Sequence, residues 1–350
     1  MIRRTRFRLA TTLVAAAATA MLLTGCVAGE NSGASKSTTD AKGATVTHGG
    51  TLTIDYATYN PLSLIIKKEG WLEDALKKQD ITVKWVLSTG SSQANQLLSS
   101  GSGDVASSAG SAAVLNRANG SQIRAIDNYS QPDWSALVVG KDSSITSVSQ
   151  LKGKKIAAQL GTDPYFFLLQ ALAANGLTTK DVTIENLTHA NGLAALQNGS
   201  VDAWAGLDPI MANAQVADGA KIIYDHPAFN SYGELIATQK FLTSEPDVAQ
   251  TVVNAYEHAR AWAAKNPSEA VSILATDAQI SQPVAKTVLS DRTNLGISPV
   301  PGSAQLKVWK TIAPTLVANG DVASQSAVNS ALSSLIDDKF AKAANPNAVG

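Results

Sequence analysis

The sequence predicts an α/β protein built as two similar lobes that face each other across a cleft. Strand-like and helix-like segments alternate from residue 49 to about residue 245, which is typical of sheets covered by helices on both faces. A seven-residue pattern occurs twice, as LSSGSGD at 98–104 and as LQNGSVD at 196–202. The chain has 350 residues, a length that predicts two domains, and with 45% apolar and 16% charged residues it has enough apolar material for a large core.

Alternating apolar residues predict the strands, and apolar residues at helical spacing predict the helices. Strands are expected at 51–56, 81–87, 104–107, 124–126, 136–139, 155–158, 182–187, 203–206 and 221–224. Helices are expected at 62–78, 93–99 and 164–175, the last ending at Gly176. From Pro246 onward the chain is expected to be almost all helical, with stops at Pro267, Pro283, residues 296–301 and Gly320.

The repeated pattern predicts the same local unit in each lobe. In both copies a helix ends at a glycine, an aspartate opens a short strand, and the strand runs into a loop of small residues. Two α/β lobes of this kind enclose a cleft, and ligands bind at the carboxyl ends of their strands. Chance similarity is the alternative in a chain so rich in Ser, Gly and Ala.

The first 26 residues predict export and lipid attachment. Residues 1–8 are cationic, 9–23 are apolar, and Leu23-Thr24-Gly25-Cys26 looks like a bacterial lipobox. The apolar run is shorter than the ~20 residues of a comfortable transmembrane helix. We therefore expect a signal peptide at 1–25, a lipidated Cys26 and a flexible tether over 26–48, with a free or buried thiol as the alternative.

Charge and cysteine content exclude several classes of protein. The chain has 28 basic and 28 acidic side chains, and removing the four Arg of residues 1–25 leaves 24 against 28, a net of −4. A mildly acidic protein is a poor candidate for nucleic-acid binding. One Cys excludes an intramolecular disulfide, and none of the four His has a Cys or a carboxylate at metal-ligand spacing, so no metal and no cofactor are expected.

Several motifs together resemble one family. The most specific stretch is GSVDAWAGLDP at 199–209, supported by LKGKKIA at 151–157, by Gly161-Thr162 before a helix, and by the run from Asp104 to Ser111. Over about 51–335 the sequence resembles the substrate-binding lipoproteins of ABC importers for aliphatic sulfonates, taurine and nitrate. That group also includes binders of thiamine precursors (pyrimidines).

The resemblance implies a type II periplasmic-binding fold that does no chemistry on its ligand. Lobe 1 would comprise 49–134 plus 235–345 and lobe 2 would comprise 135–234, with crossovers near 133–136 and 232–236. The implied partners are a small-molecule ligand, an ABC permease and its ATPase, and the membrane through the lipid anchor. We expect a monomer on the outer face of the bacterial cytoplasmic membrane, or on the periplasmic side of an envelope membrane.

Candidate ligand-binding residues follow the ends of predicted strands. Tyr56, Tyr59 and Asn60 supply hydrogen-bonding groups and flat apolar faces after the first strand, although the two Tyr could equally pack the base of the lobe. Further donors are expected from residues in the loops after other strands, namely Ser91, Gly110 and Ser111.

The turn at 161–164 predicts an anion site at a helix N-terminus. Asp163 suits the N-cap and Pro164 the first helical position, which leaves Gly161 and Thr162 and the free N–H groups facing the cleft. An ordinary capped helix is the alternative. The carboxylate of Asp163 would compete with an anion, which weakens the assignment of a sulfonate.

Three more residues are candidates, each with a structural alternative. Trp204 could stack on the ligand or belong to the core, and Asp208 could contact ligand or cap the next helix. Arg292 could bind an anionic head group, as the resemblance suggests, or pair with an acid.

We therefore expect a solute receptor that captures a small polar anion of the sulfonate, taurine or nitrate class by hinge closure. A neutral heteroaromatic such as a thiamine-pyrimidine precursor is the alternative ligand, favoured by Tyr56, Tyr59, Trp204 and Asp163. No G-x-S-x-G, P-loop or H-E-x-x-H motif occurs, so no enzyme activity is expected. An exported enzyme or a structural surface protein on the same fold is the alternative from another class.

Overall fold

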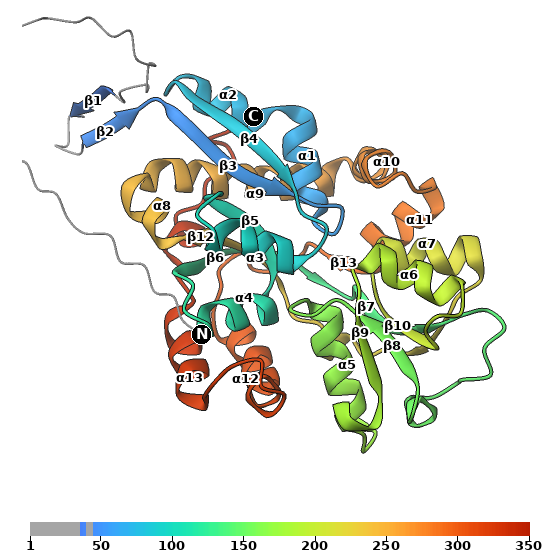
Figure 1. Cartoon of the computed structure of the whole chain (residues 1–350). Coiled ribbons are helices and arrows are strands. Elements are labelled where there is room, and N and C mark those ends of the chain that lie inside the picture. Colours follow the sequence, from blue (N-terminus) through green and yellow to red (C-terminus); the bar gives the residue numbers. More distant parts are fainter. Residues whose placement is uncertain (1–35, 40–44) are drawn as a thin grey trace, which may run out of the picture. The chain divides into compact units, whose positions relative to one another are not determined.

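Two mixed β-sheets organise the chain in the computed structural model, which describes residues 36–39 and 45–350 (Figure 1). The six-stranded sheet has the order β13-β6-β12-β5-β3-β4, and the five-stranded sheet has the order β11-β7-β10-β8-β9. We call the six-stranded sheet with its helices the first lobe, and the five-stranded sheet with its helices the second lobe. Each lobe mixes parallel and antiparallel pairs, as large sheets commonly do.

The strands of the two lobes are β3 (Gly50–Tyr56), β4 (Ile81–Leu87), β5 (Val105–Ala109), β6 (Ile123–Pro132), β7 (Ser135–Val139), β8 (Lys155–Ala158), β9 (Thr183–Asn186), β10 (Ala203–Leu207), β11 (Lys221–Tyr224), β12 (Gly233–Thr238) and β13 (Thr293–Asn294). Two further strands, β1 (Lys36–Thr39) and β2 (Thr45–His48), pair antiparallel within the segment expected to be a tether. Both are rich in the β-branched residues that favour strands.

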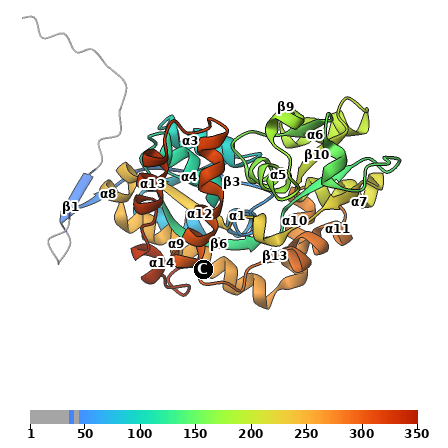
Figure 2. The same ribbon diagram turned by 90° about the horizontal axis from the view of Figure 1, so that it is seen from below.

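The α-helices are α1 (Pro61–Glu69), α2 (Trp71–Lys77), α3 (Ser91–Ser99), α4 (Gly110–Ala118), α5 (Asp163–Ala174), α6 (His189–Gln197), α7 (Ile210–Asp218), α8 (Gln239–Ser244), α9 (Pro246–Lys265), α10 (Pro267–Asp277), α11 (Gln282–Lys286), α12 (Ser303–Ala318), α13 (Gln325–Ser334) and α14 (Lys339–Lys342). Shorter helical turns are η1 (Val148–Leu151), η2 (Thr179–Asp181), η3 (Pro227–Phe229) and η4 (Thr287–Asp291). Figures 1 and 2 show that the C-terminal helices α12 and α13 lie beside α4, although more than 180 residues of sequence separate them. No helix of the described residues is both long and apolar enough to cross a bilayer.

The single helix predicted over 62–78 is wrong. Gly70 adopts a left-handed conformation with φ 73°, which ends α1 and begins α2. Its N–H donates to the carbonyl of Ile66, a helix C-cap that glycine provides because it has no Cβ to strain. The apolar spacing continues across the break, so periodicity alone did not reveal it.

The strand predicted at 124–126 is present but longer than expected, because β6 runs for ten residues and pairs with both β12 and β13. Its second half contains the buried polar side chains of Asp127, Asn128 and Ser130. These polar residues conceal the apolar pattern of a buried strand, and register shifts against β12 interrupt the alternation further.

The repeated heptapeptide has the same structure in both lobes. Gly101 and Gly199 end helices at φ 70° and 75°, in the left-handed region. Asp104 accepts a hydrogen bond from the N–H of Thr53 at 2.8 Å, and Asp202 accepts one from the N–H of Lys155 at 2.9 Å. In each lobe the aspartate therefore fastens the start of one strand to its parallel neighbour.

The chain passes between the lobes twice, and the two passages are bonded to each other. The first passage lies between Pro132 and Ser135, and the second between Tyr224 and Gly233. Asn230 accepts a hydrogen bond from the N–H of Ser135 and donates one to Asp133, both at 2.9 Å. The second crossover was expected near 232–236, but most of that segment belongs to β12, and the passage lies before it.

The paired aspartates predict unequal losses of stability. Asp104→Ala leaves the buried N–H of Thr53 without an acceptor, and we expect the free energy of unfolding to fall by about 1–3 kcal/mol. Asp202→Ala frees the N–H of the exposed Lys155, which water can reach, so its loss should be smaller. Urea unfolding of both variants measures this difference, and equal losses would contradict it.

Candidate ligand-binding site

The first contact between the lobes is a buried carboxylate held by four donors. Asp163, at the start of α5, accepts hydrogen bonds from the hydroxyl of Ser111 on α4 and from the indole N–H of Trp134 at 2.7 Å. Ser231 donates both its N–H, at 2.8 Å, and its hydroxyl, at 2.6 Å. Burial raises the pKa of Asp163, although all four hydrogen bonds act in the opposite direction.

The expected N-cap at Asp163 is wrong by one position. Thr162 occupies the N-cap with extended backbone, and Asp163 and Pro164 are the first two helical residues. The hydroxyl of Thr162 donates to the carbonyl of Gln159 at 2.6 Å. The carboxylate of Asp163 is therefore directed to donors of the first lobe and of the passages between the lobes, and not to its own helix.

The second contact between the lobes is an ion pair. Arg292, between η4 and β13, binds both carboxylate oxygens of Asp208 at 3.1 and 3.2 Å and donates to Gln215 at 2.7 Å. Asp208 also accepts from the N–H of Ala212, in the first turn of α7, at 2.9 Å, while Pro209 is the N-cap residue of that helix. Burial raises the pKa of Asp208 to about 6, and the guanidinium of Arg292 only partly offsets it.

The third contact joins the N-termini of α3 and α6. Gln159 donates to the hydroxyl of Ser92 at 2.7 Å and accepts from the N–H of His189 at 3.1 Å. The imidazole of His189 lies against Gly90, where a Cβ atom would be only 3.1 Å from Nε2. His189 is 1% exposed, and neither ring nitrogen has a hydrogen-bond partner among the described residues.

The loop after β3 forms a buried polar cluster in the first lobe. Tyr59 donates to the carbonyl of Ser107 at 3.1 Å, and its ring packs edge-on against Trp134 at 6.0 Å. Asn60 donates to the hydroxyls of Ser107 and Tyr256 at 3.0 and 3.1 Å. Tyr59 thus lies next to the contact between the lobes, and the polar groups of both predicted residues are bonded inside the first lobe.

Asp55 lies in the same cluster and accepts two hydrogen bonds from Ser107, both at 2.7 Å. Burial raises the pKa of Asp55 to about 7, and the bonds to Ser107 oppose this shift. Tyr56 points elsewhere: its ring contacts Trp85 at 6.4 Å and lies beneath the amine of Lys67 at 4.8 Å.

The remaining predicted residues divide between the contact region and the core. Ser91 accepts from the N–H of Ala109 at 2.9 Å, and Gly110 leaves room for the indole of Trp309. Gly161 has φ 71° in the loop facing α3 and α4. Trp204 is 0% exposed and belongs to the small core beneath α6, which fits the core alternative for this residue.

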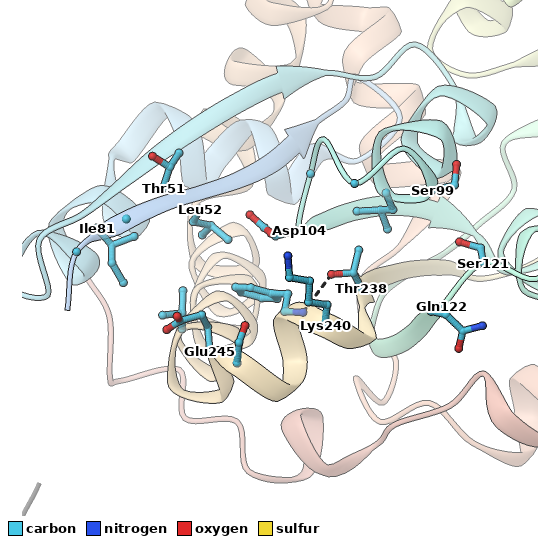
Figure 3. A pocket seen from close by; sticks show the side chains of 18 of the residues that line it. Thr51, Leu52, Ile81, Ser99, Asp104, Ser121, Gln122, Thr238, Lys240 and Glu245 are labelled. Atoms are coloured by element: carbon cyan, nitrogen blue, oxygen red, sulfur yellow. Dashed lines mark hydrogen bonds between the residues drawn. The ribbon is translucent and has the colours of Figure 1, made fainter. Parts of the chain in front are cut away.

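A groove of about 240 Å³ follows α3 and α4 beside the contact between the lobes. Its lining carries no charged side chain: Ser92, Asn95, Gln96, Ser99, Ala112, Leu115, Asn116, Asn119 and Gly161. A second cavity, of about 480 Å³, lies at the far end of the first lobe (Figure 3). It contains Asp104, Lys240 and Glu245 and none of the predicted ligand-binding residues.

The predicted residues that lie near the contacts between the lobes are Ser91, Ser111, Gly161, Thr162, Asp208 and Arg292. Gln159 and His189 also lie at these contacts, although neither was predicted and all four His were expected to be incidental. Both residues follow the carboxyl ends of parallel strands, β8 and β9, and that rule could have found them. Within the described ranges no group of three or more His, Cys, Asp or Glu side chains is arranged to hold a metal ion.

A family model described as NMT1/THI5 like matches residues 66–270. The chain belongs to the NMT1/THI5-like family. It is 30% identical over 232 residues to a protein of Bacillus subtilis (strain 168) named as an aliphatic sulfonates-binding protein, covering 65% of this chain and 70% of that relative. The resemblance inferred from the sequence motifs is confirmed.

Solved structures place the NMT1/THI5-like chain in the periplasmic-binding fold. The alkanesulfonate-binding protein SsuA from Xanthomonas axonopodis pv. citri, bound to MOPS, is similar with TM-score 0.73 and 23% identity, over 81% of this chain and 98% of that one. The desulfurization enzyme DszB is similar with TM-score 0.61 and 16% identity, over 83% and 97% of the two chains. The predicted two-lobed fold is confirmed, and the fold also occurs in an enzyme.

The ion pair between the lobes predicts a pH-dependent loss of stability. Arg292→Met leaves the buried carboxylate of Asp208 without its cation, and we expect a loss of about 3 kcal/mol at pH 8. Folding raises the pKa of Asp208, so the free energy of unfolding falls as the pH rises from about 4 through 6. Loss of the cation raises this pKa further, so in the variant the fall continues to a higher pH. The variant should therefore recover stability toward pH 5, where Asp208 is protonated.

Urea unfolding of the wild type and the variant at pH 5 and pH 8 measures this effect. The double variant Arg292→Met with Asp208→Asn is the matched control, because it removes the buried charge as well, and its stability should not depend on pH in this way. A loss of equal size at both pH values in the single variant would contradict the assignment.

Proposed function

We propose that this protein is the solute-binding component of an ABC importer and that its ligand is a small aliphatic sulfonate or a similar anion, such as taurine or nitrate. The observation that carries this proposal is the pair of lobes that meet through polar side chains, in a family whose curated relatives are named for binding aliphatic sulfonates. A permease and an ATPase of the membrane are the partners that such a function requires.

Hinge closure follows from the way the passages are built. We propose lobe boundaries close to the expected 49–134 plus 235–345 and 135–234, with the second boundary moved back to the start of β12 at Gly233, so that only two short segments connect the halves. Asn230 ties the two segments together, which makes them move as one hinge. Ligand captured between the lobes would be released to the permease when the hinge opens.

The carboxylate of Asp163 bears on where an anionic head group can bind. The donors of Ser111, Trp134 and Ser231 are already occupied by Asp163, which stands in the position of an anion at the start of α5. A second negative charge there would be repelled in a site of low dielectric. The head group is therefore expected at another set of donors along the same contact.

A neutral heteroaromatic ligand, such as a thiamine-pyrimidine precursor, is the second candidate. It is favoured by the uncharged groove beside α3 and α4, whose amide groups include the unpartnered oxygen of Asn95 and nitrogen of Asn116. An amide oxygen accepts and an amide nitrogen donates, so a pyrimidine ring that carries both kinds of group can use both, whereas an anion can use only the donor.

Enzymatic activity on the same fold is the alternative from a different class, since DszB shares the architecture. Binding without turnover is favoured here because the named relatives are binding proteins.

We further propose an exported lipoprotein held at the outer face of a membrane through Cys26 and acting as a monomer. Cys26, the signal peptide and most of the tether lie outside the described residues.

The ligand class is tested by binding to the purified full-length protein. We expect ethanesulfonate, taurine or nitrate to bind saturably, one to one, and to raise the melting temperature by several degrees, because ligand bound only to the folded state stabilises it. Aminopyrimidines serve as the comparison. A shift with aminopyrimidines alone would transfer the proposal to the neutral ligand, and consumption of a sulfonate during the assay would favour an enzyme.

The anchor is tested with Cys26→Ala. Without the thiol no thioether to lipid can form, so we expect unprocessed or soluble protein in place of a membrane-bound form. Fractionation of cells and mass spectrometry of the N-terminal peptide measure this. Continued attachment through a fatty acyl group in the variant would contradict a lipid anchor at Cys26.

A further inference from the structure

The cavity at the far end of the first lobe has the size and the apolar floor of a ligand site. Its volume is about 480 Å³, within the range of roughly 300–1,000 Å³ that small-molecule pockets occupy. Five elements supply the apolar side chains of its floor: Leu52 of β3, Ile81 of β4, Leu98 of α3, Phe241 of α8 and Val248 of α9. All five belong to the core of the lobe, so the floor is formed before any solute binds.

Three charged side chains surround this floor, and each comes from a different segment (Figure 3). Asp104 precedes β5, Lys240 belongs to α8, and Glu245 lies between α8 and α9. Two carboxylates against one ammonium leave the lining with a net charge of −1. Among the described residues no ion pair joins Lys240 to either carboxylate. The lining therefore has a negative charge that a bound cation can balance.

The two carboxylates are partly buried, and each weakens the ionisation of the other. Burial raises the pKa of Asp104, while the N–H of Thr53 and the amine of Lys240 act in the opposite direction. Burial also raises the pKa of Glu245, and the charges of Asp104 and Asp247 raise it further. A cation between the two carboxylates would relieve this repulsion, because opposite charge nearby favours the ionised form.

Both carboxylates have acceptor oxygens left for a ligand. Asp104 uses Oδ2 for the N–H of Thr53, which fixes the carboxylate in place, and within the described part of the chain Oδ1 has no partner. Glu245 is the N-cap residue of α9, but its side chain makes no capping hydrogen bond. Free acceptors of this kind suit a group that only donates, such as a primary ammonium with its three N–H bonds.

We propose that this cavity is a second binding site, for a small organic cation that carries a primary ammonium on a short aliphatic body. The ammonium binds between Asp104 and Glu245, and the aliphatic body packs against the apolar floor. The cavity lies at the start of β5, whereas Ser111, which bonds Asp163 of the second lobe, follows the end of that strand. The inference thus goes beyond the proposed function and does not depend on which solute binds between the lobes.

The test is calorimetric titration of the full-length protein with hexylamine at about pH 7.5, where an alkylammonium is charged. We expect saturable binding of one hexylamine per chain. Hexanol has the same aliphatic body without the charge, and it should bind about tenfold more weakly. Hexanoate should bind more weakly still, because the two carboxylates repel its charge.

Substitutions in the lining should change the affinity for hexylamine in opposite directions. Asp104→Asn keeps an acceptor for the N–H of Thr53 but removes the charge, and Glu245→Gln also removes one charge. Each should weaken binding about tenfold. Lys240→Gln removes a competing cation and should strengthen binding about threefold. A purely structural role of these residues would not produce effects of opposite sign.

Asp202→Asn is the matched control. Asp202 fastens two strands of the second lobe as Asp104 does in the first, and it lies outside the cavity. This variant should bind hexylamine as the wild type does. If Asp104→Asn does not fold, Glu245→Gln, Lys240→Gln and the comparison of the three solutes decide the point.

Hexylamine binding that does not saturate, an equal affinity for hexanol, or an unchanged affinity in the Asp104→Asn and Glu245→Gln variants would overturn the second site. Displacement of hexylamine by ethanesulfonate would also overturn it, because the two solutes would then share one site. These outcomes leave the proposed binding of a sulfonate intact. Failure of every sulfonate to bind would, in turn, leave the second site intact.

Discussion

The buried carboxylate of Asp163 is the interaction on which the arrangement of the lobes depends. A charge taken out of water must be compensated by hydrogen bonds, and here the donors come from α4 of the first lobe and from both passages. If the lobes separated at this point, the carboxylate would exchange these donors for water. The contact therefore couples the position of α5 to that of the first lobe and to the hinge.

Much of the fold could be predicted because it depends on local patterns. β4, β8 and β11 begin and end where the alternation of apolar residues placed them, and Gly176 stops α5 as expected. The repeated heptapeptide predicted a shared unit, and the matching bonds of Asp104 and Asp202 explain why the pattern recurs. Prediction from local patterns failed where polar residues are buried in a strand, as in the second half of β6.

The site could be predicted only in part, because its contacts join residues far apart in the chain. Ser111 and Asp163 are 52 positions apart, and Ser92 and Gln159 are 67 apart. The strand-end rule selected Ser111 and Gly161, but no local signal shows that Asp163 would turn from its helix to Ser231. His189 was not predicted because no Cys or carboxylate lies at metal-ligand spacing from it in the sequence. Its burial without a hydrogen-bond partner among the described residues is visible only in three dimensions.

Closure of the lobes around a solute is the central claim, and an inter-lobe distance tests it most directly. Dyes on Gln96→Cys in α3 and Asn198→Cys after α6, in a chain carrying Cys26→Ser, report on it by single-molecule energy transfer. The account predicts that saturating ligand moves the population to one state with a shorter distance. An unchanged distribution of inter-lobe distances, with a ligand that demonstrably binds, would contradict closure of the lobes around the solute.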